Sequence, residues 1–221
     1  MIPLINYKDI DIDLIKYNSL VSFKKKNLLI ANYNNETLHT VIKSQRIYNI
    51  DISEKTILIE VEIDNCFRNF ILDIDSFNKK YIDSNYKKWF KNKYNLDILE
   101  NKYKTNLCLK KNTPKTILQF KILLDVPEIP FQIYDKHKNK ISIFDIKEND
   151  EIHLLLQYSG LIIDSKNTKF EAGWNIIQIR VIKNIDEKKN SIKFDNCKIF
   201  DKYDSDDDDN IIDNKTYIKY I

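Results

Sequence analysis

The chain has 221 residues, 43% of them hydrophobic and 31% charged, which is enough apolar material for one domain of ordinary size with appendages. Its formal net charge of +3 is unevenly spread, because the last 21 residues carry −4 and the first 200 carry +7. No run approaches the ~18 apolar residues of a membrane span and no signal-peptide pattern opens the chain, so we expect no membrane association.

Residues 1–50 mix short apolar clusters with polar stretches, and we expect short strands or an extended arm there. Lys24, Lys25 and Lys26 form a basic cluster within this region. The cluster has the charge to contact phosphates, although a solvated loop is the simpler interpretation.

Residues 57–63 alternate between apolar and polar, which predicts a half-buried strand. Residues 65–74 are expected to form its partner strand after a tight turn at Asp64. This second stretch carries Phe67 and Arg68, an aromatic–basic pair that is a weaker candidate for nucleic-acid contact, with core packing as the alternative for the ring.

Residues 75–104 change to steps of three and four between apolar side chains, which predicts an inserted helical segment. Ser84 could cap part of this segment. Trp89 is expected to anchor the helix on the sheet rather than to stack on bases.

Strands are expected again beyond the helical segment, at 116–126, 131–134, 141–146 and 191–200. The first of them carries Lys121, another weaker candidate for a phosphate contact.

The strongest pattern covers residues 151–182, which contain both glycines of the chain. Residues 152–163 and 174–182 are apolar runs with period-two alternation, and the polar, basic segment 164–173 separates them. The pattern predicts two antiparallel strands joined by a long loop.

In strict alternation, Trp174, Gln178 and Arg180 would share one face of the second strand. Lys166 and Lys169 lie in the connecting segment. A ring for stacking beside cations for phosphates suits single-stranded nucleic acid. The alternative for Trp174 is an ordinary core position.

The YSG of the first strand, the Phe of the spacer and the GWNIIQIRV of the second strand resemble a known signature. It is that of the OB-fold single-stranded DNA-binding proteins of nucleocytoplasmic large DNA viruses and related linear plasmids, which are related to phage single-stranded DNA-binding proteins with acidic tails. Leu161 and Ile162 depart from it, because an aromatic is common there. The matching residues are Tyr158, Ser159, Gly160, Phe170, Gly173, Trp174, Gln178 and Val181.

The order strands, helix, strands, hairpin predicts a mainly β fold, an OB-like β-barrel with one or two inserted helices, and the resemblance implies the same. A β-sandwich is the alternative architecture. We expect one domain over residues 1–200, followed by a tail over 201–221.

The tail contains a dense carboxylate run that should be disordered, because like charges repel and nothing there can be buried. By resemblance it would recruit a DNA polymerase or helicase. It could also occupy, in place of DNA, the basic groove that we expect on the first 200 residues. A solubilising appendage is the alternative. The run consists of Asp204, Asp206, Asp207, Asp208 and Asp209.

The sequence shows no nucleotide-binding glycine loop, no Rossmann fingerprint and no GxSxG elbow, so we expect no enzyme and no cofactor. The three cysteines are far apart and odd in number, which predicts neither a zinc site nor disulfides and suits a reducing, cytoplasmic compartment. The enzymatic alternative is a metal-dependent nuclease that gathers Asp73, Asp75 and Glu60.

Together these patterns predict a protein that binds single-stranded DNA largely independently of sequence, in replication or recombination of a viral or plasmid-like genome. A scaffolding protein of a virion or replication complex is the main alternative, and homo-oligomerisation is left open. The expected nucleic-acid-binding residues are Trp174, Arg180, Lys166, Lys169, Tyr158, Phe170, Gln178, Phe67, Arg68 and Lys121.

Overall fold

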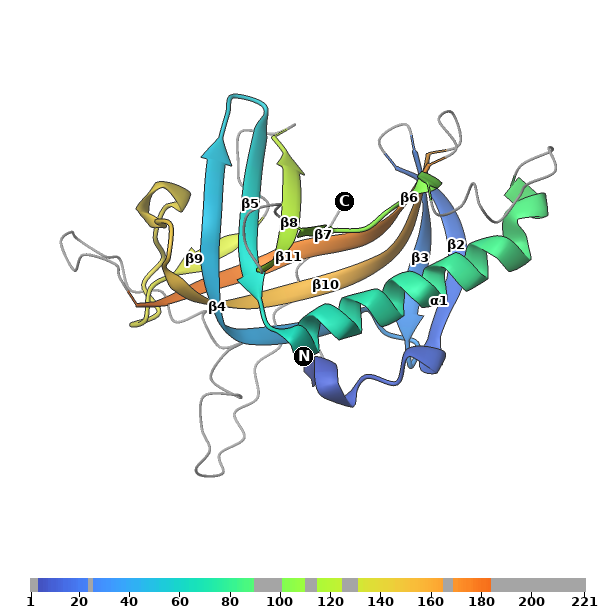
Figure 1. Cartoon of the computed structure of the whole chain (residues 1–221), viewed down its shortest axis with the longest axis horizontal. Helices are drawn as coiled ribbons and strands as arrows, with labels where there is room; N and C mark the ends of the chain where they lie inside the picture. Colours follow the sequence, from blue (N-terminus) through green and yellow to red (C-terminus); the bar gives the residue numbers. More distant parts are fainter. Residues whose placement is uncertain are drawn as a thin grey trace.

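The computed structural model describes residues 4–23, 26–89, 101–109, 115–124, 131–164 and 169–183. This part of the chain forms an 11-stranded, mainly antiparallel sheet and one long α-helix (Figure 1). The expected mainly β fold with an inserted helix is therefore confirmed. The strand expected at 191–200 and the acidic tail lie outside the described residues.

The predicted hairpin is the centre of the sheet and consists of β10 (Glu151–Asp164) and β11 (Lys169–Lys183). Its strands are longer than expected, because their pairing continues to Asp164 opposite Lys169. The long loop expected at 164–173 is therefore wrong: half of that segment, residues 169–173, belongs to β11.

The other edge of β10 is divided between two partners. β4 (Leu38–Ile52) pairs with its first part and β3 (Lys26–Tyr33) with its last part, beginning at Gly160. Gly160 has a φ of +129°, and a Cβ atom there would lie 2.0 Å from the backbone oxygen of Leu29. Only glycine allows β3 to approach β10 this closely.

Four further strands extend the sheet: β5 (Thr56–Ile63), β6 (Tyr103–Lys104), β7 (Leu107–Leu109) and β8 (Thr116–Leu123). The order of pairing runs from β4 through β5 and β8 to β7. Two residues separate β6 from β7. β6 pairs with β11, β11 pairs with β10, and β10 pairs with β4. The segment 103–109 therefore pairs with β11 through β6 and with β8 through β7.

The N-terminal region is more regular than expected. β1 (Leu4–Asn6) runs parallel to β4, and β2 (Ile15–Phe23) pairs with β3. On the other side of the hairpin, β9 (Gln132–Tyr134) runs parallel to β11. The short 3₁₀ helices are η1 (Tyr7–Asp9), η2 (Ile12–Leu14) and η3 (Ile143–Asp145).

A β-bulge at Ile177 shifts the register of β11 against β10. Trp174 lies before the bulge and Ile179 after it, yet both belong to the main core. The prediction that Trp174, Gln178 and Arg180 share one face is therefore wrong, because one extra residue reverses the alternation of side chains.

The helix α1 (Asn65–Trp89) follows β5 directly. The Asp64 carboxylate caps it by accepting a hydrogen bond from the Phe67 backbone nitrogen at 2.7 Å. Each buried apolar side chain contributes about 1.5–3 kcal/mol to folding. The buried side chains recur at helical spacing: Phe67, Phe70, Ile71, Ile74, Asn78 and Ile82.

Three local predictions are corrected by these elements. The stretch 65–74 is helix and not strand, because its apolar residues already follow steps of three and four. Ser84 lies inside the helix, where its hydroxyl donates to the Lys80 carbonyl at 3.0 Å, so it is not a cap. The stretch 141–146 contains η3 in place of a strand.

Among the residues that the structure describes, no helix combines the length and apolar character needed to cross a membrane.

Candidate nucleic-acid interface

A pocket of about 240 Å³ lies at one end of the hairpin, where three segments of the chain meet. Each segment contributes one lysine: Lys26 from β3, Lys104 from β6 and Lys169 from β11. We call this the cationic pocket. The remaining residues that line it are Ile162, Asp164, Phe170 and Glu171.

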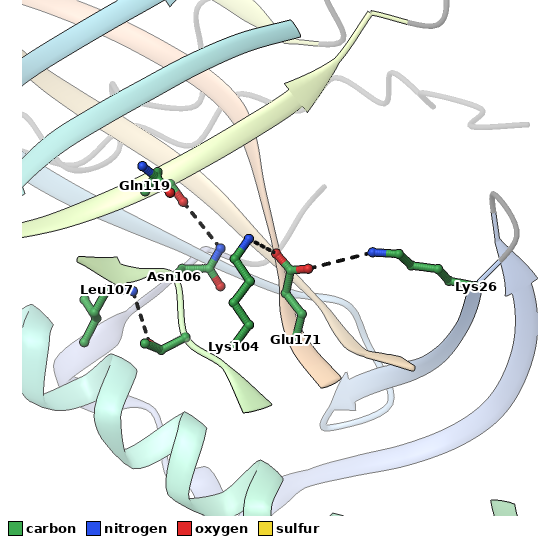
Figure 2. A network of polar contacts seen from close by, with 7 residues as sticks. Lys26, Lys104, Asn106, Leu107, Gln119 and Glu171 are labelled. Carbon is green, nitrogen blue, oxygen red and sulfur yellow. Dashed lines mark hydrogen bonds and ion pairs between the residues drawn. The ribbon is translucent and has the colours of Figure 1, made fainter. Parts of the chain in front are cut away.

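One carboxylate bridges two of the lysines. Lys104 Nζ lies 3.2 Å from one oxygen of Glu171, and Lys26 Nζ lies 3.9 Å from the other (Figure 2). The lysine side chains are 60% and 42% exposed, respectively, whereas Glu171 is 27% exposed. Both ammonium groups are therefore accessible to a ligand in solvent.

Backbone pairing explains why these side chains meet. Lys104 is the cross-strand partner of Glu171. Asn27, next to Lys26, is the partner of Ile163 near the end of β10. Asp164 pairs with Lys169 where the hairpin strands begin and end. The pocket is thus fixed by the register of four strands.

The floor of the pocket is rigid. Phe170 is 1% exposed and belongs to a second core cluster beneath the pocket. Its ring centroid lies 6.4 Å from that of Tyr86 on α1. The other buried members of the cluster are Leu29, Ile82, Tyr103, Leu161 and Ile163.

A buried polar network holds the strand that carries Lys104. The Tyr103 hydroxyl donates to the Asp75 carboxylate at 2.7 Å and accepts from the Asn78 amide at 2.8 Å. The Tyr158 hydroxyl donates to the same Asn78 side chain at 2.9 Å. Because Lys104 directly follows Tyr103, the network fixes its backbone relative to α1 and β10.

Burial also sets the protonation of this network. It raises the pKa of the Tyr103 and Tyr158 hydroxyls, and that of Tyr17, whose hydroxyl lies 2.6 Å from Tyr158. Burial likewise raises the pKa of the Asp75 carboxyl. The hydroxyls therefore remain protonated at neutral pH, as hydrogen-bond donors must.

The segment after β6 is also hydrogen-bonded to β8. The Gln119 backbone nitrogen donates to the Asn106 carbonyl at 2.9 Å. The Asn106 amide donates to the Gln119 carbonyl at 3.4 Å (Figure 2). Lys104 therefore projects from a segment held by α1, β8 and β11.

The electrostatics of the cationic pocket favour an anion. Three lysines face two carboxylates, those of Asp164 and Glu171, so the pocket carries a net positive charge. Ion pairs as exposed as those of Glu171 contribute only about 0–1 kcal/mol. A phosphate oxygen can therefore replace the Glu171 carboxylate, and charge-assisted hydrogen bonds to the lysines would hold it.

The aromatic residues expected to stack on bases are all buried: Trp174 is 6% exposed, Tyr158 0%, Phe170 1% and Phe67 0%. The Trp174 ring lies 4.9 Å from Tyr158 and 6.1 Å from Phe70. The core alternative for Trp174 thus describes its position, and none of these four rings offers a face to solvent.

The expected cations are scattered. Lys169 lies in the cationic pocket, whereas Lys166 is outside the described residues. Lys121 is exposed on β8, and Arg68 is half-buried on α1. Neither lines the pocket.

Arg180 and Gln178 lie near the opposite end of the hairpin, where β9 pairs with β11. Arg180 is 9% exposed, and its guanidinium donates to the Lys136 carbonyl at 3.2 Å. Gln178 is 1% exposed. Both side chains are therefore packed into the structure and far along β11 from Lys169.

Lys104 was missed by the sequence reasoning, and Lys26 was noted only within a basic cluster. Lys104 and Glu171 are 67 residues apart, and only the pairing of β6 with β11 brings them together. No local pattern predicts that pairing, because β6 has two residues.

The carboxylates considered for a nuclease have other partners. Glu60 accepts hydrogen bonds from the Gln119 amide at 2.9 Å and the Asn49 amide at 3.3 Å. Asp75 accepts from Tyr103, and Asp73 is exposed. Within the described ranges, no group of three or more His, Cys, Asp or Glu side chains is placed to hold a metal ion.

Comparison with solved structures finds a distant likeness to the single-stranded DNA-binding protein from bacteriophage Enc34. The TM-score is 0.45 at 9% sequence identity, covering 76% of this chain and 92% of that chain. A C-terminal truncation of that protein gives a TM-score of 0.39 at 9% identity, covering 79% and 98%. Similarity at this level carries no assignment of function.

The chain has no match among the curated proteins. Residues 45–196, which run from β4 through the whole hairpin, match the model of a family of unknown function, DUF5871. Because the match covers more than half of the sequence, the chain belongs to this family.

Proposed function

We propose that the chain binds single-stranded DNA through the cationic pocket, without catalysing a reaction. The observation that supports this most directly is the meeting of Lys26, Lys104 and Lys169 from three segments around one displaceable carboxylate. The positive charge of the first 200 residues adds a long-range attraction for a polyanion.

In the proposed mechanism, a backbone phosphate displaces Glu171 from Lys26 and Lys104, and Lys169 contacts a neighbouring phosphate. Binding releases the counterions condensed on the nucleic acid, so the affinity falls as salt rises. Each phosphate contact on a single strand contributes about 0.7 to the slope of log affinity against log salt. Lysine contacts of this kind carry no base specificity.

The preference for a single strand is supported by the resemblance of the hairpin to OB-fold single-strand binders. Several of the matching residues have structural roles in this chain. Gly160 and Gly173 are cross-strand partners, and the Ser159 hydroxyl donates to the Gly173 carbonyl at 2.8 Å. The resemblance therefore concerns the scaffold that carries the ligand site, and not the ligand contacts themselves.

The acidic tail is proposed to compete with DNA for the cationic pocket and to recruit a polymerase or helicase once DNA displaces it. Its charge of −4 against a body of +7 supports this role. Replication or recombination of a viral or plasmid-like genome is the proposed setting.

The first experiment compares the full chain with the double variant Lys26→Ala/Lys104→Ala. Binding of labelled oligo-dT and of duplex DNA of equal length is measured by fluorescence anisotropy between about 50 and 200 mM salt. We expect the full chain to prefer the single strand. The double variant should bind it about tenfold more weakly at low salt, with a salt slope reduced by roughly 1–1.5.

The matched control is Lys55→Ala, which removes an exposed lysine from the turn between β4 and β5. It should leave the affinity almost unchanged. Equal loss in the control and the double variant would show a diffuse charge effect and contradict a specific pocket. Absence of DNA binding by the full chain would favour the scaffolding alternative. Magnesium-dependent cleavage of the DNA would favour the nuclease alternative.

A further inference from the structure

Phe144 is an exposed aromatic side chain at the end of the hairpin opposite the cationic pocket. It is 75% exposed, and among the described side chains no other aromatic residue is exposed. It belongs to η3, which precedes β10, whereas residues near the end of β10 line the pocket. A ligand that covered this ring would remove its apolar surface from water.

The turn that carries Phe144 is held in one conformation. The Ser142 hydroxyl accepts a hydrogen bond from the Phe144 backbone nitrogen at 3.3 Å. The Asp145 carboxylate accepts one from the Ser142 backbone nitrogen at 2.9 Å. The flanking side chains Ile143 and Ile146 are 2% and 6% exposed and belong to the main core. The ring therefore projects from a rigid, anchored base.

The charges around the ring are balanced. Lys140 and Lys147 are exposed on the same loop, and so are Asp145 and Glu148. Unlike the cationic pocket, this loop carries no excess positive charge to attract phosphates. A ligand that binds here must gain its affinity from contact with the ring.

We propose that Phe144 is a stacking site for an unpaired nucleobase, a second contact for the strand held at the cationic pocket. The inference rests on the proposed function, because a strand must already be bound. A base offers a flat aromatic face, and stacking on a side chain is tolerant of sequence. The rigid turn reduces the loss of backbone conformational entropy on binding.

The two sites then differ in a measurable way. Lysine contacts set the slope of affinity against salt, because each releases counterions. Stacking on a neutral loop displaces no counterions. Loss of the Phe144 ring should therefore lower the affinity equally at all salt concentrations.

The test uses the full chain, Phe144→Ala and Phe144→Trp, with labelled oligo-dT of about 20 nucleotides, longer than the site size of one OB fold. We expect Phe144→Ala to bind on the order of 5- to 100-fold more weakly, with an unchanged salt slope. Phe144→Trp should retain the affinity, and its indole fluorescence should be quenched when DNA is added.

Leu123→Ala is the matched control, because Leu123 is also a large exposed apolar residue, at 50%. Its affinity should equal that of the full chain. If Phe144→Ala binds as tightly as the full chain while Lys26→Ala/Lys104→Ala loses affinity, the stacking site is wrong and the proposed function stands. If the full chain does not bind oligo-dT, the proposed function itself fails.

Discussion

The middle of the β10–β11 hairpin and the regions beside its two ends use their side chains in opposite ways. In the middle, Tyr158, Gly160, Gly173 and Trp174 are buried and pack the strands against each other and against α1. Beside one end, Lys26, Lys104 and Lys169 line the cationic pocket, and beside the other end η3, outside the two strands, carries the exposed ring of Phe144. The aromatic and glycine residues of the hairpin itself therefore build the scaffold, and the proposed contacts lie beside its two ends.

The two ends also differ from each other. The cationic pocket depends on the pairing of strands that are distant in sequence, and its lysines share one carboxylate. The Phe144 turn depends on a local capping box and carries balanced charge. We therefore expect one end to contribute salt-dependent affinity and the other to contribute salt-independent affinity.

The largest expected effect on stability separates a ring in the middle from a ring at an end. Trp174→Ala should lower the free energy of unfolding by about 3–5 kcal/mol, because it leaves a cavity in the main core. Phe144→Ala should change it by less than about 0.5 kcal/mol, since the ring is exposed. Urea denaturation of the two variants measures both values.

The core role of Trp174 would be contradicted if Trp174→Ala were as stable as the full chain and bound oligo-dT more weakly. That outcome would place the tryptophan in the binding site. Our interpretation requires the reverse: the folded fraction of Trp174→Ala should bind with normal affinity.

The sequence predicts the two strands of the hairpin, because the apolar, alternating runs at 152–163 and 174–182 are a strong local signal. It does not predict the bulge at Ile177, which depends on how β11 fits β10, and one inserted residue was enough to assign Gln178 and Arg180 to the wrong face. The strand expected at 65–74 is the start of α1, and its apolar residues already have helical spacing in the sequence.

The candidate site was less predictable than the fold. Lys169 was expected near phosphates, but Lys104 reaches the pocket only through the register of β6 with β11. The signal for Phe144 was present in the sequence, because Ser142 and Asp145 have the spacing of a capping box. That signal predicts a rigid turn, and only the burial of its neighbours shows that the ring itself faces water.

Asp75 anchors Tyr103 beneath the pocket by accepting a hydrogen bond from its hydroxyl. Burial raises the pKa of its carboxyl, so the folded chain keeps this proton to a higher pH than the unfolded chain. Its contribution to stability is therefore greatest below the unfolded pKa of about 3.9 and is lost as pH rises through the folded pKa.

Asp75→Asn cannot ionise and keeps an oxygen acceptor for the Tyr103 hydroxyl. Relative to the full chain, this variant should gain stability as pH rises from about 4 to 7, by on the order of 1 kcal/mol. Thermal melting across that range measures the difference. Asp73→Asn, at an exposed position of the same helix, is the matched control. An identical pH profile in the full chain and both variants would contradict the role assigned to Asp75.

The smallest expected effect is that of Glu171. Its substitution should raise the affinity for DNA, whereas the lysine and Phe144 substitutions should lower it. Its carboxylate lies between Lys104 and Lys26 in the position proposed for a phosphate. Glu171→Gln removes the competing charge and keeps the size of the side chain, so oligo-dT should bind a few-fold more tightly at low salt. The two proteins should converge as salt rises, because screening weakens the difference in charge. Stability should change by less than about 0.5 kcal/mol, as expected for an exposed ion pair.

Glu148→Gln removes the same charge from the Phe144 turn, far from the lysines of the pocket, and should have a weaker effect. Equal tightening by both variants would reduce the role of Glu171 to net charge alone, whereas weaker binding by Glu171→Gln would show that the carboxylate holds the lysines in place for DNA.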